Sequence, residues 1–289
     1  MIQIGILLAV GCALVTNLAF FYKQRGAKLA PSVRATRPLV SAKALFGSPW
    51  FMFGMLVAVG AWLLHVAAMA FAPLTTVQVV LAGGIVLVGV MANRCFGFGV
   101  TRQQWLGLAL TALGLAAFAL TVPGGGGARS SFSQSGMIAF EAVLCGLGAA
   151  LIAGPSAGAP REHHGTMLGA ATGILFGVSD VSIKALTGIA SAHGPLAVLL
   201  SPWLAVTVAA SIVAFFASAK SLQDGDAVPV IAITSASANM SAIAGGFLVF
   251  GDPLPSGAIG IVVQALGVLT VVCAAAVMPS TRLAGSPAS

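Results

Sequence analysis

The residue best placed to do chemistry is Asp180, because it stands within a long apolar stretch, residues 166–187. Ser179 and Ser182 lie beside it, and Lys184 follows four residues later. In a helix this spacing places Asp180 and Lys184 on one face, where opposite charges attract. Such a carboxylate either meets a solute or forms an internal ion pair that holds helices together, and the sequence leaves both interpretations open.

A second polar group lies in the apolar stretch 228–249. Asn239 is its strongest candidate for contact with a small molecule, because an amide both donates and accepts hydrogen bonds. Ser237 is a weaker candidate, since hydroxyl side chains in apolar helices often bond to their own helix or to a neighbour. The full group is Thr234, Ser235, Ser237, Asn239 and Ser241.

Two further titratable residues stand in apolar surroundings. His65 can gain or lose a proton near neutral pH, although a lone histidine is also a common packing residue. Glu141 lies near one end of the stretch 136–153, where it can carry a proton, attract a cation or face water as an interfacial carboxylate. With Ser179 they complete the candidate site: Asp180, Asn239, His65, Ser237, Ser179 and Glu141.

The elements that must position these residues are apolar helices. Of the 289 residues, 58% are hydrophobic and 7% are charged, far fewer charges than the roughly one quarter typical of soluble domains. A bilayer crossing needs about 20 mostly apolar residues. Such stretches predict an all-α, polytopic membrane bundle of about nine transmembrane helices, at 2–22, 49–70, 74–92, 104–122, 136–153, 166–187, 196–218, 228–249 and 256–278.

The basic residues predict the orientation in the membrane. Six of the thirteen Lys and Arg residues lie in the loop after the first stretch, residues 23–48. Cytoplasmic loops are enriched in Lys and Arg, so this loop is predicted inside, with the N-terminus outside and the C-terminus cytoplasmic. The expected location is the inner or plasma membrane. This distribution also explains the net charge of +7 without nucleic acid as a partner.

Several function classes lack their motifs. The glycine run 124–127 has no Lys-Ser/Thr ending, so it does not resemble a phosphate-binding loop. The serines and His65 are dispersed along the chain, and an enzyme is not predicted. The four cysteines are isolated from one another, so neither a disulfide framework nor a metal site is indicated, and no cofactor is expected.

Two segments of the chain repeat in the same order. Leu81–Gly89 (LAGGIVLVG) is similar to Ile243–Gly251 (IAGGFLVFG), and Gly107–Gly114 (GLALTALG) is similar to Gly260–Gly267 (GIVVQALG). Corresponding helices are five crossings apart, an odd number, so the two copies are predicted to insert in opposite orientations. The sequence thus predicts a 5+4 inverted-topology repeat, with residues 1–154 as the first unit and 155–279 as the second.

The repeated glycine pairs have two interpretations. Gly83 and Gly84 in one copy, and Gly245 and Gly246 in the other, can let helix backbones approach closely in lipid. They can also be local flexing points, and the two roles are compatible. Residues 280–289, rich in Ser, Ala and Pro, are expected to be a disordered tail.

The first half resembles a known family. It has Lys23-Gln-Arg-Gly26 after the first stretch, Trp50 at the start of the second, and His65-Val-Ala-Ala-Met-Ala-Phe-Ala-Pro73 before the third. These features are similar to those of NIPA-type magnesium transporters of the drug/metabolite transporter superfamily. The resemblance implies magnesium transport. The chain departs from the family pattern at His65, where the family usually has Asn, and at Val79–Leu81.

Inverted repeats are typical of secondary transporters, which expose a central site to each side of the membrane in turn. The sequence therefore predicts such a transporter, with a small solute or divalent cation and the lipid bilayer as partners and a homodimer as a possible assembly. A proton-coupled exporter of a small organic metabolite or drug is one alternative, and a non-transporting membrane scaffold is another. A polar cavity between the two halves would distinguish a transporter from a scaffold.

Overall fold

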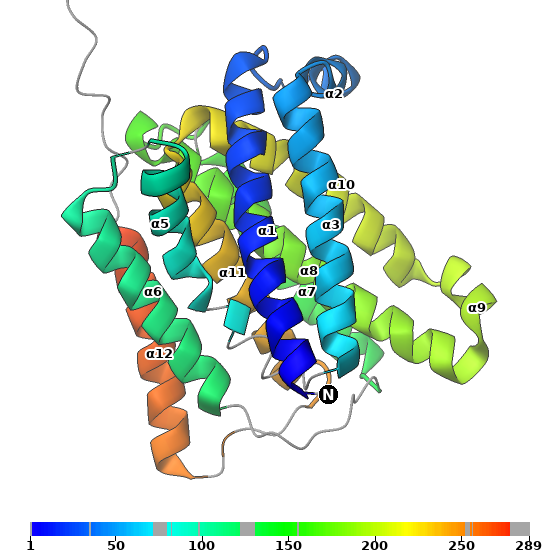
Figure 1. Ribbon diagram of the computed structural model, residues 1–289. Coiled ribbons are helices and arrows are strands. Elements are labelled where there is room, and N and C mark those ends of the chain that lie inside the picture. Colours follow the sequence, from blue (N-terminus) through cyan, green and yellow to red (C-terminus); the bar gives the residue numbers. More distant parts are fainter. Residues whose placement is uncertain are drawn as a thin grey trace, which may run out of the picture.

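The computed structural model describes residues 2–34, 36–71, 80–81, 83–97, 99–121, 131–154, 156–251, 255 and 257–277. This part of the chain folds into helices and contains no strand. The predicted all-α class is therefore confirmed. Figure 1 shows long helices packed side by side, with both ends of most of them at the two opposite faces of one bundle.

The helices follow one another in this order along the chain. They are α1 (Ile2–Leu29), α2 (Pro38–Phe46), α3 (Pro49–Phe71), α5 (Ile85–Cys95), α6 (Arg102–Thr121), α7 (Gln134–Ala153), the 3₁₀ turn η1 (Arg161–His163), α8 (His164–His193), α9 (Pro195–Leu199), α10 (Pro202–Asp224), α11 (Ala227–Leu248) and α12 (Ala258–Val277).

Helix boundaries differ from those expected in several places, and the expected crossing 196–218 is divided between α9 and α10. The first helix continues past residue 22 to Leu29, and α8 is 30 residues long. A short helix, α2, occupies part of the expected basic loop. The expected turn at Ala72-Pro73, the loop residues 124–127 and the tail 280–289 lie outside the described residues.

Five helical segments are long and apolar enough to cross a membrane by length and composition: Gln3–Leu29, Gln134–Ala153, Arg161–Ala190, Pro202–Asp224 and Ala227–Leu248. The bent pair of α2 with α3 adds a sixth if it is one span, and Ile85–Cys95 and Ala258–Val271 are shorter apolar helices. Large apolar side chains also cover the outside of the bundle, for example Leu56 of α3, Leu113 of α6, Val143 of α7 and Leu266 of α12. An apolar exterior of this kind suits lipid rather than water, as expected of a membrane protein.

Helix α2 lies almost perpendicular to α3, with an angle of 89° between them. Pro38 occupies its first turn, where a missing backbone N–H has no cost. Ser41 and Leu45 are buried against the bundle, whereas Leu39, Val40 and Phe46 are exposed. This short helix therefore presents apolar side chains outward at the end of the bundle.

Glycines allow α1 and α3 to pack closely. A Cβ atom at Gly54 of α3 would lie 2.7 Å from the backbone nitrogen of Lys23, and one at Gly26 of α1 would overlap the backbone of Phe51. Each helix thus offers a glycine where the other's backbone approaches. Small residues are the usual means of close helix packing in lipid, where the hydrophobic effect does not drive helices together.

Helix α8 has a longer glycine face toward α11. Gly165, Gly169, Gly173 and Gly177 recur every four residues, and a Cβ atom on any of them would crowd α11 or the turn before it. A Cβ atom on Gly165 would overlap Gly225, and one on Gly177 would overlap Ser241. This four-glycine repeat is visible in the sequence, but sequence reasoning did not use it.

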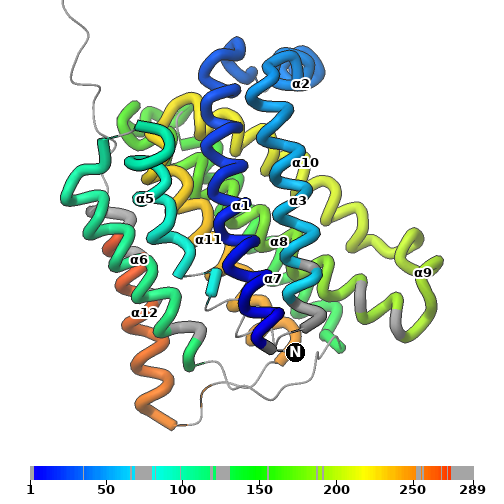
Figure 2. The backbone as a smooth tube through the Cα atoms, in the orientation of Figure 1, coloured from blue at the N-terminus to red at the C-terminus, as the bar shows by residue number. Residues whose placement is uncertain are grey.

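The helices that carry the repeated segments run in opposite directions. Figure 1 shows α5 running toward the end of the bundle where α1 ends, whereas α11 runs away from that end; α6 and α12 are likewise opposed. Figure 2 shows α6 and α12 lying along each other, and they are in extensive contact.

One apolar core joins α1, α2, α3, α5, α6, α10, α11 and α12 at the end of the bundle where α1 ends. It includes Phe21 of α1, Phe51 of α3, Leu108 of α6, Leu222 of α10 and Ile231 of α11. Toward the opposite end the described cores are separate. One cluster holds Ala9, Ala68 and their neighbours from α1 and α3, and another holds residues of α7, α8 and α10 with Val249 and Phe250. The two halves are therefore joined by one core at one end only, within the described residues.

Candidate functional site

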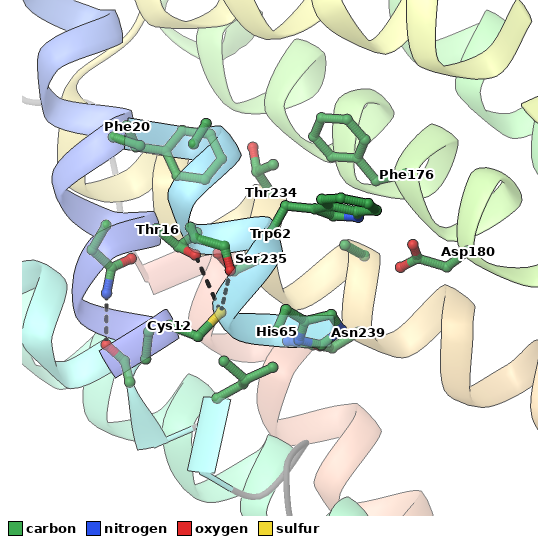
Figure 3. Close-up of a pocket in the computed structure, with 18 of the residues that line it drawn as sticks. Cys12, Thr16, Phe20, Trp62, His65, Phe176, Asp180, Thr234, Ser235 and Asn239 are labelled. Carbon is green, nitrogen blue, oxygen red and sulfur yellow. Dashed lines mark hydrogen bonds between the residues drawn. The ribbon is translucent and has the colours of Figure 1, made fainter. Parts of the chain in front are cut away.

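A cavity of about 470 Å³ lies between the helices of the first half and those of the second. Helices α1, α3 and α5 form one wall, and α8, α10 and α11 form the other. Figure 3 shows its polar side chains converging from both walls. Its size falls in the range of about 300–1,000 Å³ that is usual for small-molecule pockets.

Four of the six candidate site residues line this cavity. Asp180 and Ser179 come from α8, His65 comes from α3, and Asn239 comes from α11. In Figure 3 the carboxylate of Asp180 points into the space beside His65 and Asn239. Residues that lie 174 positions apart in the sequence thus share one site, which no local pattern could establish.

The other two candidates lie elsewhere. Ser237 packs against Gly173 of α8, where its Cβ atom leaves no room for a side chain on that glycine. Glu141 of α7 is only 4% exposed and accepts a hydrogen bond from Ser182, so it does not face water as an interfacial carboxylate. Helix α8 contributes Ser182 to this bond and Asp180 to the cavity. Glu141 and the cavity therefore lie against different faces of α8.

The four glycines of the repeated pairs have different surroundings. Gly84 lines the cavity, and a Cβ atom there would lie 2.6 Å from that of Ala13 in α1. Gly245 packs so closely on α8 that a Cβ atom would overlap Val181. Gly246 is buried, whereas Gly83 is exposed with open space around it. Close packing therefore explains Gly84 and Gly245, and it does not explain Gly83.

Asp180 and Lys184 do not form the expected ion pair. The ammonium of Lys184 lies over the ring of Phe250, 4.3 Å from its centroid. Among the described residues Asp180 has neither an ion-pair nor a hydrogen-bond partner, and its side chain is exposed to the cavity. The interpretation of these two charges as a pair that holds helices together is therefore wrong. Phe250, in the segment after α11, offers the ammonium of Lys184 an aromatic face instead.

The wall formed by α1 is polar but its groups are occupied. The amide of Asn17 donates a 3.0 Å hydrogen bond to the carbonyl of Gly84, and so holds α5 against α1. The thiol of Cys12 lies 3.3 Å from the carbonyl oxygen of Ala61 and 3.8 Å from the hydroxyl of Thr16. Across the cavity, the hydroxyl of Ser179 lies 3.0 Å from that of Ser211. These side chains thus stabilise the walls, whereas Asp180 remains available.

Sequence reasoning missed three lining residues. Trp62 of α3 and Phe176 of α8 bring aromatic rings to the cavity, and neither was among the predicted site residues. Lys23 was expected in a loop, but it lies inside α1 and lines the cavity, because the helix continues to Leu29. Its ammonium lies over the ring of Phe20, 4.1 Å from the centroid.

The end of the bundle beyond Lys23 is closed by contacts between the two halves. The side chain of Gln223 in α10 donates to the carbonyls of Ala27 and Pro31, at 2.8 and 3.1 Å, and accepts from the backbone N–H of Val33 at 2.9 Å. Phe215 of α10 stacks on Phe46 of α2 at a centroid distance of 5.8 Å. Polar and aromatic contacts thus reinforce the shared apolar core at this end.

The cavity is open beside Asp180. Trp62 is 60% exposed, and Ile183, one turn beyond Asp180, is 42% exposed, although both line the cavity. In the described part of the chain α3 packs mainly on α1, and α8 packs on α7, α10 and α11, with little or no contact between α3 and α8. Asp180 itself is exposed, so the cavity is accessible beside α3 and α8.

The site offers few ligands for a bound metal. No group of three or more His, Cys, Asp or Glu side chains is gathered in the part of the chain that the structure describes. Asp180 is the one carboxylate among the described residues that line the cavity. The arrangement can pair with one positive charge, and it can form hydrogen bonds through His65, Asn239 and Ser235.

Comparison of the chain with protein-family models, with curated proteins and with solved structures gives no match. The resemblance to magnesium transporters therefore rests on the sequence motifs of the first half. What the fold and the exterior define is a helical protein with several helices apolar enough to span a membrane.

Proposed function

We propose that this protein is a secondary transporter that moves a small solute across a membrane by alternating access. The observation that carries the proposal is the cavity between the two halves, open beside Asp180 and closed beyond Lys23. A site that is accessible from one direction and sealed in the other is the arrangement that alternating access needs. A scaffold has no need of such a cavity.

The opposed helix directions support the proposal. Helices α5 and α11 carry the similar segments Leu81–Gly89 and Ile243–Gly251 and run in opposite directions, as do α6 and α12. Nine crossings in two inverted units, with α1, α3, α5 and α6 corresponding to α8, α10, α11 and α12, account for these directions. Rocking of one unit against the other would close the gap at α3 and α8 and part the contacts at Gln223.

The basic residues indicate which end of the bundle faces the cytoplasm. Lys28, Arg34, Arg37 and Lys43 lie at the closed end, between α1 and α3. With these residues cytoplasmic, as the distribution of positive charge favours, the end that Gln223 closes faces the cytoplasm. Helix α2 then lies along the membrane surface with Leu39 and Val40 in contact with lipid, as interfacial helices do. The membrane is the inner or plasma membrane in this proposal.

Divalent cation transport, which the family resemblance implies, is the second candidate. The observation that favours it is the unpaired carboxylate of Asp180 in the cavity. Mg²⁺ is usually held by one or two carboxylates with several retained water molecules, and the cavity has room for these waters. Uptake of Mg²⁺ and of organic solutes into liposomes that contain the purified protein separates the two candidates.

Alternating access can be tested without a known substrate. In a variant without the four native cysteines, Ser235→Cys places one thiol in the cavity. A membrane-impermeant maleimide is then added to intact cells or to inverted vesicles. We expect Ser235→Cys to be labelled from both sides, and more slowly from the cytoplasmic side.

Two control positions calibrate this experiment. Gly47→Cys lies in the exposed turn between α2 and α3 and should react only from the cytoplasmic side, and Ser135→Cys, exposed at the start of α7, should react only from the other side. Labelling of Ser235→Cys from a single side over hours, with both controls behaving as expected, would contradict the proposal.

A further inference from the structure

The charge of Asp180 and the aromatic rings beside it indicate what the cavity binds. We infer that the cavity takes an organic cation, an ammonium-bearing solute whose charge pairs with Asp180 and whose apolar part packs against Trp62 and Phe176. This inference rests on the proposed function, because it names the class of solute that the transporter would carry.

The first argument is the missing counter-charge. A carboxylate among apolar helices is normally paired, because the low dielectric makes an isolated charge costly. The nearest basic residue along α8, Lys184, is directed to the ring of Phe250 instead. Figure 3 places Phe20, over whose ring the ammonium of Lys23 lies, on the opposite side of the lining residues from Asp180. A cationic solute supplies the charge that the described side chains do not.

The second argument is the aromatic pair. In Figure 3 the ring systems of Trp62 and Phe176 lie between Asp180 and the α1 residues Cys12, Thr16 and Phe20. Aromatic faces attract organic cations, and Trp attracts them most strongly. Trp62 is 60% exposed, so its indole is available to a solute that enters between α3 and α8.

The third argument is the volume. A cavity of about 470 Å³ suits a metabolite-sized molecule rather than a single ion. Ala13, Ala58, Ala61 and Ala238 provide a smooth apolar lining, while His65 and Asn239 can form hydrogen bonds. Mg²⁺, which prefers oxygen ligands at fixed octahedral positions, gains nothing from the two rings. The lining therefore favours a solute that has both an apolar body and a positive charge.

Binding to the purified protein in detergent tests this inference. The probe is benzyltrimethylammonium, and benzyl alcohol and Mg²⁺ are compared with it, using tryptophan emission and isothermal calorimetry as readouts. We expect saturable binding of the cation and none of benzyl alcohol at the same concentration. Mg²⁺ should not displace the bound cation.

Two variants and a matched control assign the site. Asp180→Asn should weaken binding of the cation at least about thirtyfold, as loss of a desolvated charge partner does, and Trp62→Leu should weaken it on the order of tenfold. Asp224→Asn removes a carboxylate that pairs with Lys220 at the closed end, 2.7 Å apart, and should leave binding unchanged. Elution at the wild-type volume in size-exclusion chromatography shows that each variant is folded.

The outcomes separate this inference from the proposed function. Absence of cation binding, or equal binding by folded Asp180→Asn, overturns the substrate class, and labelling of Ser235→Cys from both sides would leave transport standing. Displacement of the cation by Mg²⁺ would also overturn it in favour of a divalent ion. Cation binding together with one-sided labelling would keep the binding site and remove transport.

Discussion

A Cβ atom placed on Gly114 of α6 would lie 2.6 Å from the carbonyl oxygen of Gly267 in α12. These two glycines end the similar segments Gly107–Gly114 and Gly260–Gly267, so each occupies the same position in its segment. In a pair of units related by a two-fold axis, equivalent residues touch each other only near that axis. The contact of Gly114 with its own counterpart is therefore what an inverted pair with its axis at the α6–α12 crossing would produce.

The first prediction concerns this crossing. Gly114→Leu should lower the free energy of unfolding by about 1–3 kcal/mol or more, because the new side chain must push the two helix backbones apart. Gly146→Leu on α7 is the matched control, since a side chain there meets nothing within 4 Å. Thermal unfolding in detergent measures the stability of both variants. Equal melting temperatures of the two variants would show that α6 and α12 are not tightly packed at Gly114.

The second prediction concerns the glycine face of α8. Gly173→Val should displace α11, because a Cβ atom at Gly173 would already lie 2.7 Å from the Cβ atom of Ser237 and 2.9 Å from the backbone nitrogen of Ala238. Since Asn239 is the next residue, cation binding should weaken along with stability. Gly136→Val at the exposed start of α7 should change neither. A folded Gly173→Val protein that binds the cation normally would refute the link between this packing and the site.

The third prediction concerns the closed end. Gln223→Ala removes hydrogen bonds to three backbone groups, one in the last turn of α1 at Ala27 and two in the following segment at Pro31 and Val33. Each such bond contributes about 0.5–1.5 kcal/mol, so local opening should increase by roughly tenfold or more. Limited trypsin digestion at Arg34 reports this opening. Gln103→Ala, exposed on α6, is the control and should leave the cleavage rate unchanged.

The same variant also tests how the closed end affects access. If the contacts of Gln223 hold this end shut, labelling of Ser235→Cys from the cytoplasmic side should become faster when Gln223→Ala is added. An unchanged labelling rate, together with faster trypsin cleavage, would show that the segment opens without admitting solute to the cavity.

The fourth prediction concerns the acid outside the cavity. Ser182→Ala leaves the buried carboxyl of Glu141 without its hydroxyl partner, at a cost of about 1–3 kcal/mol in stability. Cation binding should be retained, because Ser182 and Glu141 do not line the cavity. Combining Ser182→Ala with Glu141→Gln should give less than the sum of the separate losses. Ser156→Ala, exposed after α7, is the control, and loss of cation binding in folded Ser182→Ala would return Glu141 to the candidate site.

Several features could be predicted because they depend on composition or on short-range spacing. Stretches as apolar as these must form helices in lipid, because every backbone N–H and C=O has to be hydrogen-bonded within the segment. Asp180, His65 and Asn239 could be selected as candidates because polar groups are rare and costly in such stretches. The buried role of Asn17 as a bond between helices also follows from its polarity in an apolar helix.

Other features were decided only by tertiary structure. Helical spacing alone placed Lys184 beside Asp180, but the position of Phe250, 66 residues further on, gave its ammonium another partner. Glu141 and Asp180 look equivalent in the sequence, yet α8 separates them, with Ser182 on one face and the cavity on the other. The sequence by itself determined which residues are too polar for lipid. Only packing between distant helices decided which of them share a cavity, because a helix fixes the direction of a side chain and not what lies opposite.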